Sequence, residues 1–315
     1  MLGVFPSPKH GLRCAFGGLL LIAAMLAGGA ALWLSYYFTH PGPLQEETTL
    51  LLPRGTGFKT ITHRLEQDGI ITHSHAFQAM VLYHGKQAAF KSGEYRFGPG
   101  VSPQAVMEQL VEGKTVLHKL TTPEGLTVEE IKRLVAAEET LEGDITITVE
   151  EGMLLPETYH FTRGEARDAI LKRMQLGMEE ALAELWPQRA DDLPFSTRKE
   201  ALTLASIVEK ETGLVDERGR VAAVFVNRLR KGMKLQADPT VAYGITEGGK
   251  LPLRPIRKSD LARNQPYNTY VISGLPPGPI ACPGKAALAA VLNPPESKEL
   301  YFVATGTGGH YFSKT

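Results

Sequence analysis

The feature that most limits how this chain can fold is an apolar run near its N-terminus, residues 14–34, which contains no charged side chain. At about 1.5 Å per residue, a helix of this length spans roughly 30 Å, which matches the hydrocarbon core of a bilayer. Tyr36, Tyr37 and Phe38 follow the run, and aromatic residues gather at membrane interfaces. The sequence therefore predicts one transmembrane helix over residues 14–36.

The charges around this run predict its orientation. Lys9 and Arg13 precede it, and the next basic residue after it is Arg54. Because cytoplasmic flanks carry the excess of Lys and Arg, residues 1–13 are expected to form a cytoplasmic tail, with the bulk of the chain outside the cytoplasm. A cleaved signal peptide is the alternative, with the small residues at 27–31 as its cleavage region. The run is longer than the usual signal core of about 7–15 residues, which favours an uncleaved single-pass anchor.

Composition excludes several classes of partner and cofactor. The formal net charge is zero and 22% of the residues are charged, so no basic surface for nucleic acid is expected. Cys14 lies in the apolar run and leaves Cys282 alone in the remainder, which excludes an intrachain disulfide framework and a cysteine zinc site. His63, His73 and His75 do not form the i, i+4 pair typical of a helical metal site. We therefore predict neither a metal nor a cofactor.

Beyond the anchor, helix and strand signals predict an α+β protein. Residues 37–46, with their Pro-Gly-Pro sequence, are predicted to be a linker. Residues 47–118 contain the signals of a strand, two helices and a closing strand, which define a small α+β domain. Residues 119–150 are predicted to form a second small α+β unit, and residues 151–315 a larger mixed α+β domain.

Local signals predict several helices and one hairpin. Thr127 followed three residues later by Glu130 fits a capping box and predicts a helix start. An amphipathic pattern predicts a helix over residues 166–185, which Pro187 ends. Near the end of the chain, residues 300–304 are predicted to form a buried strand that pairs through a glycine-rich turn with a returning strand.

A single carboxylate interrupts the apolar face of the helix predicted to begin near Ala201. At about 100° per residue, Glu211 projects between Leu204 and Ile207, whereas Glu209 points roughly 160° away from it. An apolar surrounding disfavours the ionised form and raises the pKa of a carboxyl group. A neutral carboxylic acid near pH 7 is what a general acid needs to protonate a glycosidic oxygen.

A structural role for Glu211 is the alternative. The side chain could extend past the apolar stripe and pair with Lys210, Arg218 or Arg228. Taken alone, the periodicity favours this alternative, because ion pairs commonly occupy such positions.

Three long segments favour the catalytic role of Glu211 over the structural one. The sequences SIVEKET at 206–212, ERGRVAAVFVNRLRKGMKLQADPTVAYG at 217–244 and YNTYVISGLPPGPIACPG at 267–284 closely resemble the MltG (YceG-like) family. The resemblance extends over nearly the whole chain. Members of that family are endolytic murein transglycosylases, which are anchored in the bacterial inner membrane and cut nascent peptidoglycan strands.

The resemblance implies a role for each part of the chain. It implies that the catalytic acid is the second Glu of the EKE triplet, Glu211. It also implies that residues 47–118 form a LysM-like saccharide-binding module, and that residues 151–315 form the catalytic domain, which is entered through the sequence EGMLLPETYHF. The expected partners are peptidoglycan glycan strands, the inner membrane, and peptidoglycan synthases or division proteins, with no nucleic acid.

Further polar residues are candidates for substrate binding, each with a structural alternative. Glu157 could act as a base or substrate ligand, or simply stabilise a turn after a proline. Asp238 could line a sugar groove or cap the following turn. Tyrosines beside asparagines suit saccharides, although core packing explains a tyrosine equally well. The full set of candidates is Glu157, Asn227, Gln236, Asp238, Thr240, Tyr243, Tyr267, Asn268 and Tyr270.

The resemblance also implies a mechanism that needs one acid. A lytic transglycosylase protonates the bond between N-acetylmuramic acid and N-acetylglucosamine, then removes the proton from the C6 hydroxyl as that oxygen closes a 1,6-anhydro ring. Two alternatives remain. One is a muramidase that pairs Glu211 with Glu157, Asp238 or Glu209, because hydrolases use two carboxylates. The other is a non-catalytic scaffold that binds peptidoglycan within the synthesis machinery.

Overall fold

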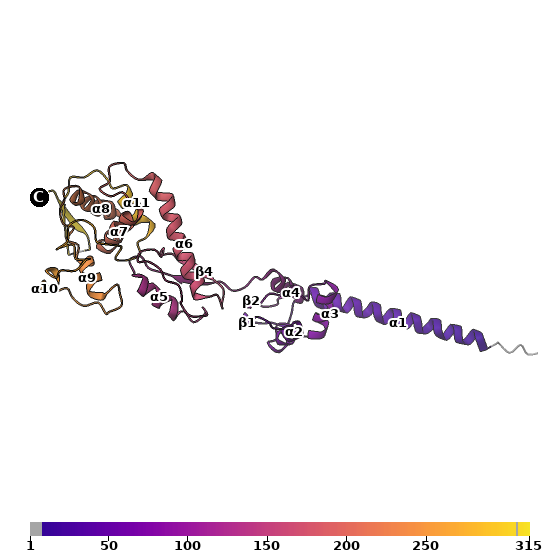
Figure 1. The fold of residues 1–315 in the computed structure, drawn as a ribbon. Coiled ribbons are helices and arrows are strands. Elements are labelled where there is room, and N and C mark those ends of the chain that lie inside the picture. The colour runs from indigo at the N-terminus through magenta and orange to yellow at the C-terminus, as the bar shows by residue number, and fades with distance from the viewer. Residues whose placement is uncertain (1–7, 307) are drawn as a thin grey trace, which may run out of the picture. The chain divides into compact units, whose positions relative to one another are not determined.

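The computed structural model describes residues 8–306 and 308–315, and it divides into two compact units, Met1–Val116 and Leu117–Thr315 (Figure 1). Within the described ranges the chain is a mostly helical α+β protein whose strands form two-stranded sheets. Of the predicted cytoplasmic tail, residues 1–7 lie outside the described part of the chain.

Helix α1 (Pro8–Thr39) contains the apolar run. An 18-residue window within Phe16–Thr39 has a mean hydropathy of 2.0, and none of it is buried inside the protein. The helix is therefore consistent with a single membrane anchor or with a signal sequence. Phe38, predicted at a membrane interface, is instead 1% exposed, and its ring centroid lies 6.3 Å from that of Phe77 in the core of the first unit.

The first unit follows the predicted order of strand, two helices and strand. Strand β1 pairs antiparallel with β2, from Thr48 opposite Phe97 to Leu52 opposite Gly93. Leu65 and Tyr95 are fully buried in the core beneath this pair. The elements after α1 are β1 (Thr48–Leu52), α2 (Phe58–Gln67), α3 (Ser74–Tyr83), β2 (Gly93–Phe97) and α4 (Pro103–Glu112).

The second unit holds the remaining elements. Its strands β3 and β4 pair antiparallel, with His118 opposite Phe161, and β5 pairs with β6 in the same sense. In chain order its elements are β3 (His118–Thr121), α5 (Val128–Ala137), β4 (Thr158–Phe161), α6 (Arg167–Leu185), η1 (Trp186–Gln188), α7 (Arg198–Glu211), α8 (Val215–Arg230), α9 (Asp238–Thr246), α10 (Lys258–Leu261), α11 (Lys285–Leu292), β5 (Tyr301–Ala304) and β6 (His310–Ser313).

Capping residues define where two of these helices begin. The predicted capping box of Thr127 and Glu130 is present at the start of α5. A second box, formed by Thr197 and Glu200, starts α7. Each box satisfies backbone N–H groups that the first helical turn leaves without partners, which fixes the residue at which the helix begins.

Helix α7 is the centre of the second unit. All residues from Ala201 to Glu209 are buried, because α7 packs against α8, α9 and α11 (Figure 1). The helix is thus enclosed on more than the one face that its apolar periodicity predicts. Beyond this buried stretch the helix ends in a more open environment, since Lys210 is exposed and Glu211 is partly accessible.

The strand predicted near the end of the chain differs from the expectation. The strand at 300–304 was expected to be buried, but β5 is mostly exposed, and the exposed fraction of Val303 is 66%. Residues 119–150 lie in the same compact unit as residues 151–315, since β3 pairs with β4 and Ile131 of α5 shares a core with Met174 of α6.

Candidate functional site

The candidate site lies at the C-terminal end of α7. Glu211 is the last residue of that helix, and Thr212 leaves it in an extended conformation. The Glu211 side chain lines a cavity of about 620 Å³. Within the described part of the chain, its carboxyl group has no hydrogen bond and no ion pair. The residues lining this cavity are Lys210, Glu211, Asp238, Pro239, Ala242, Leu253, Arg254, Pro255 and Ile256.

The surroundings of Glu211 favour its neutral form. Its pKa is raised from 4.5 to about 7, chiefly by burial and then by the charge of Asp238, while the charge of Arg228 acts in the opposite direction. A carboxylic acid with this pKa is protonated in about half of the molecules near pH 7. It can therefore donate a proton at neutral pH and accept one back, as general acid–base catalysis requires.

The ion pairs considered as an alternative for Glu211 are absent from the described residues. Lys210 donates from Nζ to the carbonyl of Gly125 at 3.1 Å. Arg228 donates from Nε to the carbonyl of Leu300 at 2.7 Å and from Nη1 to that of Leu235 at 2.6 Å. Lys210 and Arg228 therefore hold backbone carbonyls, and among the described residues the alternative of a paired Glu211 is wrong.

Glu209 has a different environment, although it belongs to the same triplet. Its Oε2 accepts the backbone N–H of Gly284 at 3.0 Å, and its Oε1 lies 3.3 Å from Nη2 of Arg218. Arg218 also approaches Glu124 at 3.5 Å. Burial raises the pKa of Glu209, while the Gly284 bond and Arg218 lower it. Glu209 thus ties α7 to α8 and to the N-cap of α11, which is a structural role.

Asp238 shares the cavity with Glu211. It is the first residue of α9, and its Oδ1 accepts a hydrogen bond from the hydroxyl of Tyr270 at 2.6 Å. Burial, followed by Asp238, raises the pKa of Tyr270 to about 12, so the phenol stays protonated as the donor. The helix N-cap is Ala237 and no side chain caps it, so the alternative in which Asp238 caps the turn is wrong.

Two further predicted residues lie next to this cavity. Tyr243 lines a smaller cavity of about 90 Å³, which shares Lys210, Ala242 and other residues with the larger one. Its hydroxyl donates to Oε2 of Glu151 at 3.3 Å, and its ring centroid lies 4.7 Å from that of Tyr267. The two tyrosines therefore form a tilted pair behind the cavity.

Of three other candidates, Asn268 and Thr240 stabilise the backbone around the site. Asn268 is fully buried and donates from Nδ2 to the carbonyls of three residues, the shortest bond being 2.8 Å to Arg263. Thr240 is fully buried and bonds to Ala237 and Thr269. Gln236 is exposed and adopts a left-handed backbone with φ of 51°. None of the three lines the cavity of Glu211.

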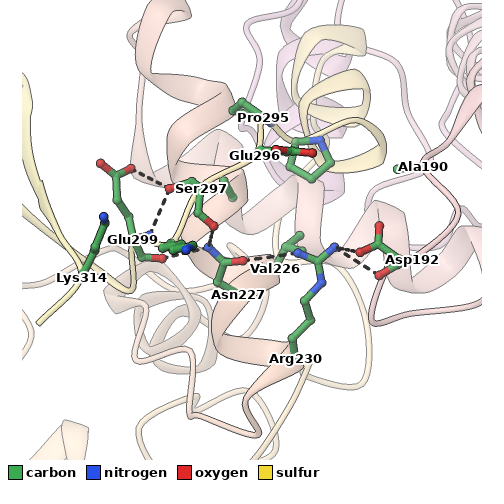
Figure 2. Close-up of a pocket in the computed structure, with 13 residues that line it drawn as sticks. Ala190, Asp192, Val226, Asn227, Arg230, Pro295, Glu296, Ser297, Glu299 and Lys314 are labelled. Atoms are coloured by element: carbon green, nitrogen blue, oxygen red, sulfur yellow. Dashed lines mark hydrogen bonds and ion pairs between the residues drawn. The ribbon is translucent and has the colours of Figure 1, made fainter.

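The remaining two candidates do not line the Glu211 cavity. Asn227 donates from its amide to the carbonyl of Ser297 at 2.8 Å and to that of Glu299 at 3.1 Å, and it lines a separate cavity of about 670 Å³ (Figure 2). In that cavity Arg230 pairs with Asp192 at 2.6 Å. Glu157 is exposed immediately before β4.

The sequence reasoning missed the loop that forms the opposite wall of the cavity. The cavity is lined on this side by Leu253, Arg254, Pro255 and Ile256, and Lys210 of α7 lines it as well. An exposed leucine between two prolines is the only local signal that marks this loop. The signal is weak, because isolated apolar residues are common on protein surfaces.

The fold and the site define a class of protein with an apolar N-terminal helix and, at the end of a central helix, a largely enclosed carboxylic acid that has no partner among the described residues. The sequence profile of the YceG-like family matches residues 50–315. The chain therefore belongs to the YceG-like family.

Relatives of known name agree with this assignment. The chain is 30% identical over 324 residues to an endolytic murein transglycosylase of Bacillus subtilis (strain 168), covering 92% of this chain and 88% of the relative. It is 27% identical to an endolytic murein transglycosylase of Streptococcus pneumoniae serotype 2 (strain D39 / NCTC 7466), covering 93% of this chain but only 61% of that longer protein. A crystal structure of a yceG-like protein from Listeria monocytogenes matches with a TM-score of 0.53 and 31% identity, over 86% of this chain and 96% of that one.

Proposed function

We propose that this chain is a membrane-anchored endolytic lytic transglycosylase of peptidoglycan. It cleaves the bond between N-acetylmuramic acid and N-acetylglucosamine in nascent glycan strands and so ends their elongation. The observation that carries the proposal is the state of Glu211, a largely enclosed carboxyl group without a partner among the described residues and with its pKa raised to about 7. The names of the relatives support the reaction class.

In this mechanism Glu211 acts twice. Its proton moves to the glycosidic oxygen as the bond from that oxygen to C1 of the muramyl ring breaks. The resulting carboxylate then takes the proton from the C6 hydroxyl of the same ring as that oxygen attacks C1. The product is a 1,6-anhydro ring, the acid is restored and no water is consumed. A group with a pKa near the working pH suits both steps, because it both gives and takes a proton readily.

The other predicted residues have supporting roles in this proposal. Asp238 contacts the sugar from the cavity that it shares with Glu211, and the hydrogen bond from Tyr270 holds the carboxylate of Asp238 in place. Tyr243 borders the same region. Thr240 and Asn268 shape the backbone and bind substrate only indirectly, because both are fully buried.

The N-terminal parts place the enzyme on its substrate in this proposal. Residues 14–36 anchor the chain in the inner membrane with the N-terminus in the cytoplasm, and the catalytic unit faces the periplasm. Residues 47–118 act as a LysM-like module that binds the glycan, and peptidoglycan synthases or division proteins are the protein partners. The apolar character of Phe16–Thr39 supports the anchor.

A two-carboxylate muramidase is the second candidate function, and one observation favours it. Asp238 lines the same cavity as Glu211, so a second carboxylate is available beside the acid. A hydrolase could use it to activate water or to stabilise the charged sugar.

The proposed function is tested by incubating the full chain, solubilised in detergent, with purified sacculi and identifying the released muropeptides by mass spectrometry. We expect new fragments that end in anhydro-muramyl residues, and no such fragments with the Glu211→Gln variant. An absence of cleavage by a folded wild-type chain would leave the non-catalytic scaffold as the function.

A further inference from the structure

One wall of the Glu211 cavity has a composition that a sugar ring does not explain. Saccharide sites combine amide and hydroxyl groups with aromatic faces, because pyranose rings carry hydroxyls around an apolar face. No amide, hydroxyl or aromatic side chain lines this cavity, whereas five of its nine lining residues are apolar. These five are Pro239, Ala242, Leu253, Pro255 and Ile256. Such a wall suits aliphatic groups of a ligand.

The loop that carries Leu253, Pro255 and Ile256 is held in place at both ends. Before Leu253, Arg133 of α5 donates from Nη2 to the carbonyl of Gly249 at 2.7 Å. After it, Arg254 forms two hydrogen bonds with the carboxylate of Asp260, at 2.7 and 2.9 Å. Leu253 nevertheless remains 73% exposed. Its side chain thus lies in water on a bonded loop, beside the other apolar residues that line the cavity.

The charges at the cavity indicate the polarity of the ligand. Arg254 is paired with Asp260, so its charge is balanced within the loop. The ammonium group of Lys210 bonds to the carbonyl of Gly125, and within the described residues no carboxylate pairs with it. Lys210 can therefore receive a carboxylate from a ligand that lies along the apolar wall.

We propose that Lys210 and the wall from Leu253 to Ile256 form a subsite for the lactyl-peptide stem of the muramyl residue. The proposal rests on the proposed function and names the part of the substrate that binds at this subsite. The stem begins at C3 of the same ring whose C1 reacts beside Glu211, so it lies within one ring of the acid. Its methyl groups complement Leu253 and Ile256, and its carboxylates complement Lys210. The enzyme therefore recognises the stem peptide of the muramyl residue at which it cleaves the glycan.

The experiment compares two substrates, uncross-linked glycan strands that carry their stem peptides and the same strands after an amidase has removed the peptides from the lactyl groups. The measured quantity is the ratio of kcat/KM for the two substrates, with the full chain in detergent. Wild type is expected to prefer stem-bearing strands. Leu253→Ser is expected to lower the ratio about tenfold, the scale of a lost aliphatic contact. The matched control is Leu251→Ser, because Leu251 lies on the same loop, is 48% exposed and does not line the cavity.

Each other outcome contradicts the subsite. Equal wild-type rates on both substrates would overturn it and leave the proposed function intact. A ratio that stays unchanged in Leu253→Ser, or that falls equally in Leu251→Ser, would mean that the wall does not recognise the stem. A folded wild-type chain that cleaves neither substrate would overturn the proposed function, and the subsite with it. Because Leu253 is mostly exposed, its substitution is not expected to disturb folding.

Discussion

The hydroxyl of Tyr270 donates a 2.6 Å hydrogen bond to Oδ1 of Asp238, and Asp238 lines the cavity that contains Glu211. The three residues come from the segment after α10, the start of α9 and the end of α7. The carboxyl group of Glu211 therefore has two kinds of neighbour, an apolar surface that encloses it and the negative charge of Asp238, which Tyr270 holds in place. Both raise the pKa of Glu211, and burial has the larger effect.

Glu211→Gln is expected to lower the rate of strand cleavage by about 10²–10⁴-fold, because glutamine keeps the shape of the side chain but has no proton to give. The measurement is the initial rate of muropeptide release by equal amounts of folded full-length protein. Circular dichroism of the two proteins should coincide.

Glu209→Gln serves as the matched control for this substitution. It should retain substantial activity per folded molecule, but it should lower the unfolding free energy by about 1–3 kcal/mol, because the buried Arg218 loses a charged partner. If Glu209→Gln lost as much activity as Glu211→Gln, or more, the assignment of Glu211 as the catalytic acid would be wrong.

The pH dependence of cleavage should report the contact between Tyr270 and Asp238. Because the acid must be protonated, the rate is expected to fall as pH rises through the pKa of Glu211, about 7. Asp238→Asn removes a charge that raises this pKa, so the descending limb should move to lower pH. Tyr270→Phe should move it in the same direction by a smaller amount, because Asp238 keeps its charge but loses its fixed position. The opposing charge of Arg228 remains in both variants, and Lys210 and Arg254 line the same cavity throughout.

A rate that falls in both variants while the limb stays in place would contradict this link. In that case Asp238 and Tyr270 would act by contacting the substrate alone. The profile of kcat/KM is the appropriate measurement, since it reports the free enzyme.

Stability should depend on pH through the same group. The pKa of Glu211 is raised from 4.5 to about 7 in the folded state, so its stabilising contribution is complete below about pH 4.5 and is lost as pH rises towards 7. Glu211→Gln removes this dependence. At pH 8 the variant should therefore have a higher unfolding free energy than wild type, by up to about 3 kcal/mol. Near pH 4.5 the two unfolding free energies should differ little. Urea titrations of both proteins at the two pH values provide the test, and a variant that is less stable at pH 8 would disprove it.

The reaction product should distinguish one acid from two carboxylates. If Glu211 serves both steps, digestion in heavy-oxygen water should give muramyl ends that lack both the added water and the label. Mass spectrometry of the fragments measures both quantities at once. Labelled reducing ends would instead show hydrolysis, and Asp238 would then be the first partner to substitute, because it shares the cavity. Glu157 would be tested next.

A reporter fusion tests the predicted orientation of the anchor. Since Lys9 and Arg13 precede the apolar run and no basic residue follows it before Arg54, the C-terminal unit is expected outside the cytoplasm. A phosphatase that folds only outside the cytoplasm, fused after Thr315, should be active in intact cells. Activity of a cytoplasm-specific reporter at the same position would contradict the predicted topology.

Features encoded by neighbouring residues were predictable from the sequence. The capping box at Thr127 and the direction of Glu211 depend on residues within one or two helical turns, so local spacing is sufficient to find them. The order of strand, two helices and strand in the first unit was predictable for the same reason.

Features that depend on distant residues were not predictable in this way. The burial of Glu209 follows from α8 and α11 packing around α7, and no periodicity within one helix contains that information. The pairing of β3 with β4 joins segments separated by the whole of α5. The roles of Thr240 and Asn268 also escaped prediction, because a polar residue looks the same in the sequence whether it binds a sugar or a backbone carbonyl.

The bonds from Lys210 to Gly125 and from Glu209 through Arg218 to Glu124 have a practical consequence for dissecting the protein. They fasten the segment before α5 to the last turn of the helix that carries the acid. A truncated protein starting at residue 151 would lose this brace and strand β3, and would expose the core face of α6. A soluble fragment for crystallisation or enzymology should therefore begin near residue 117, where the two compact units divide.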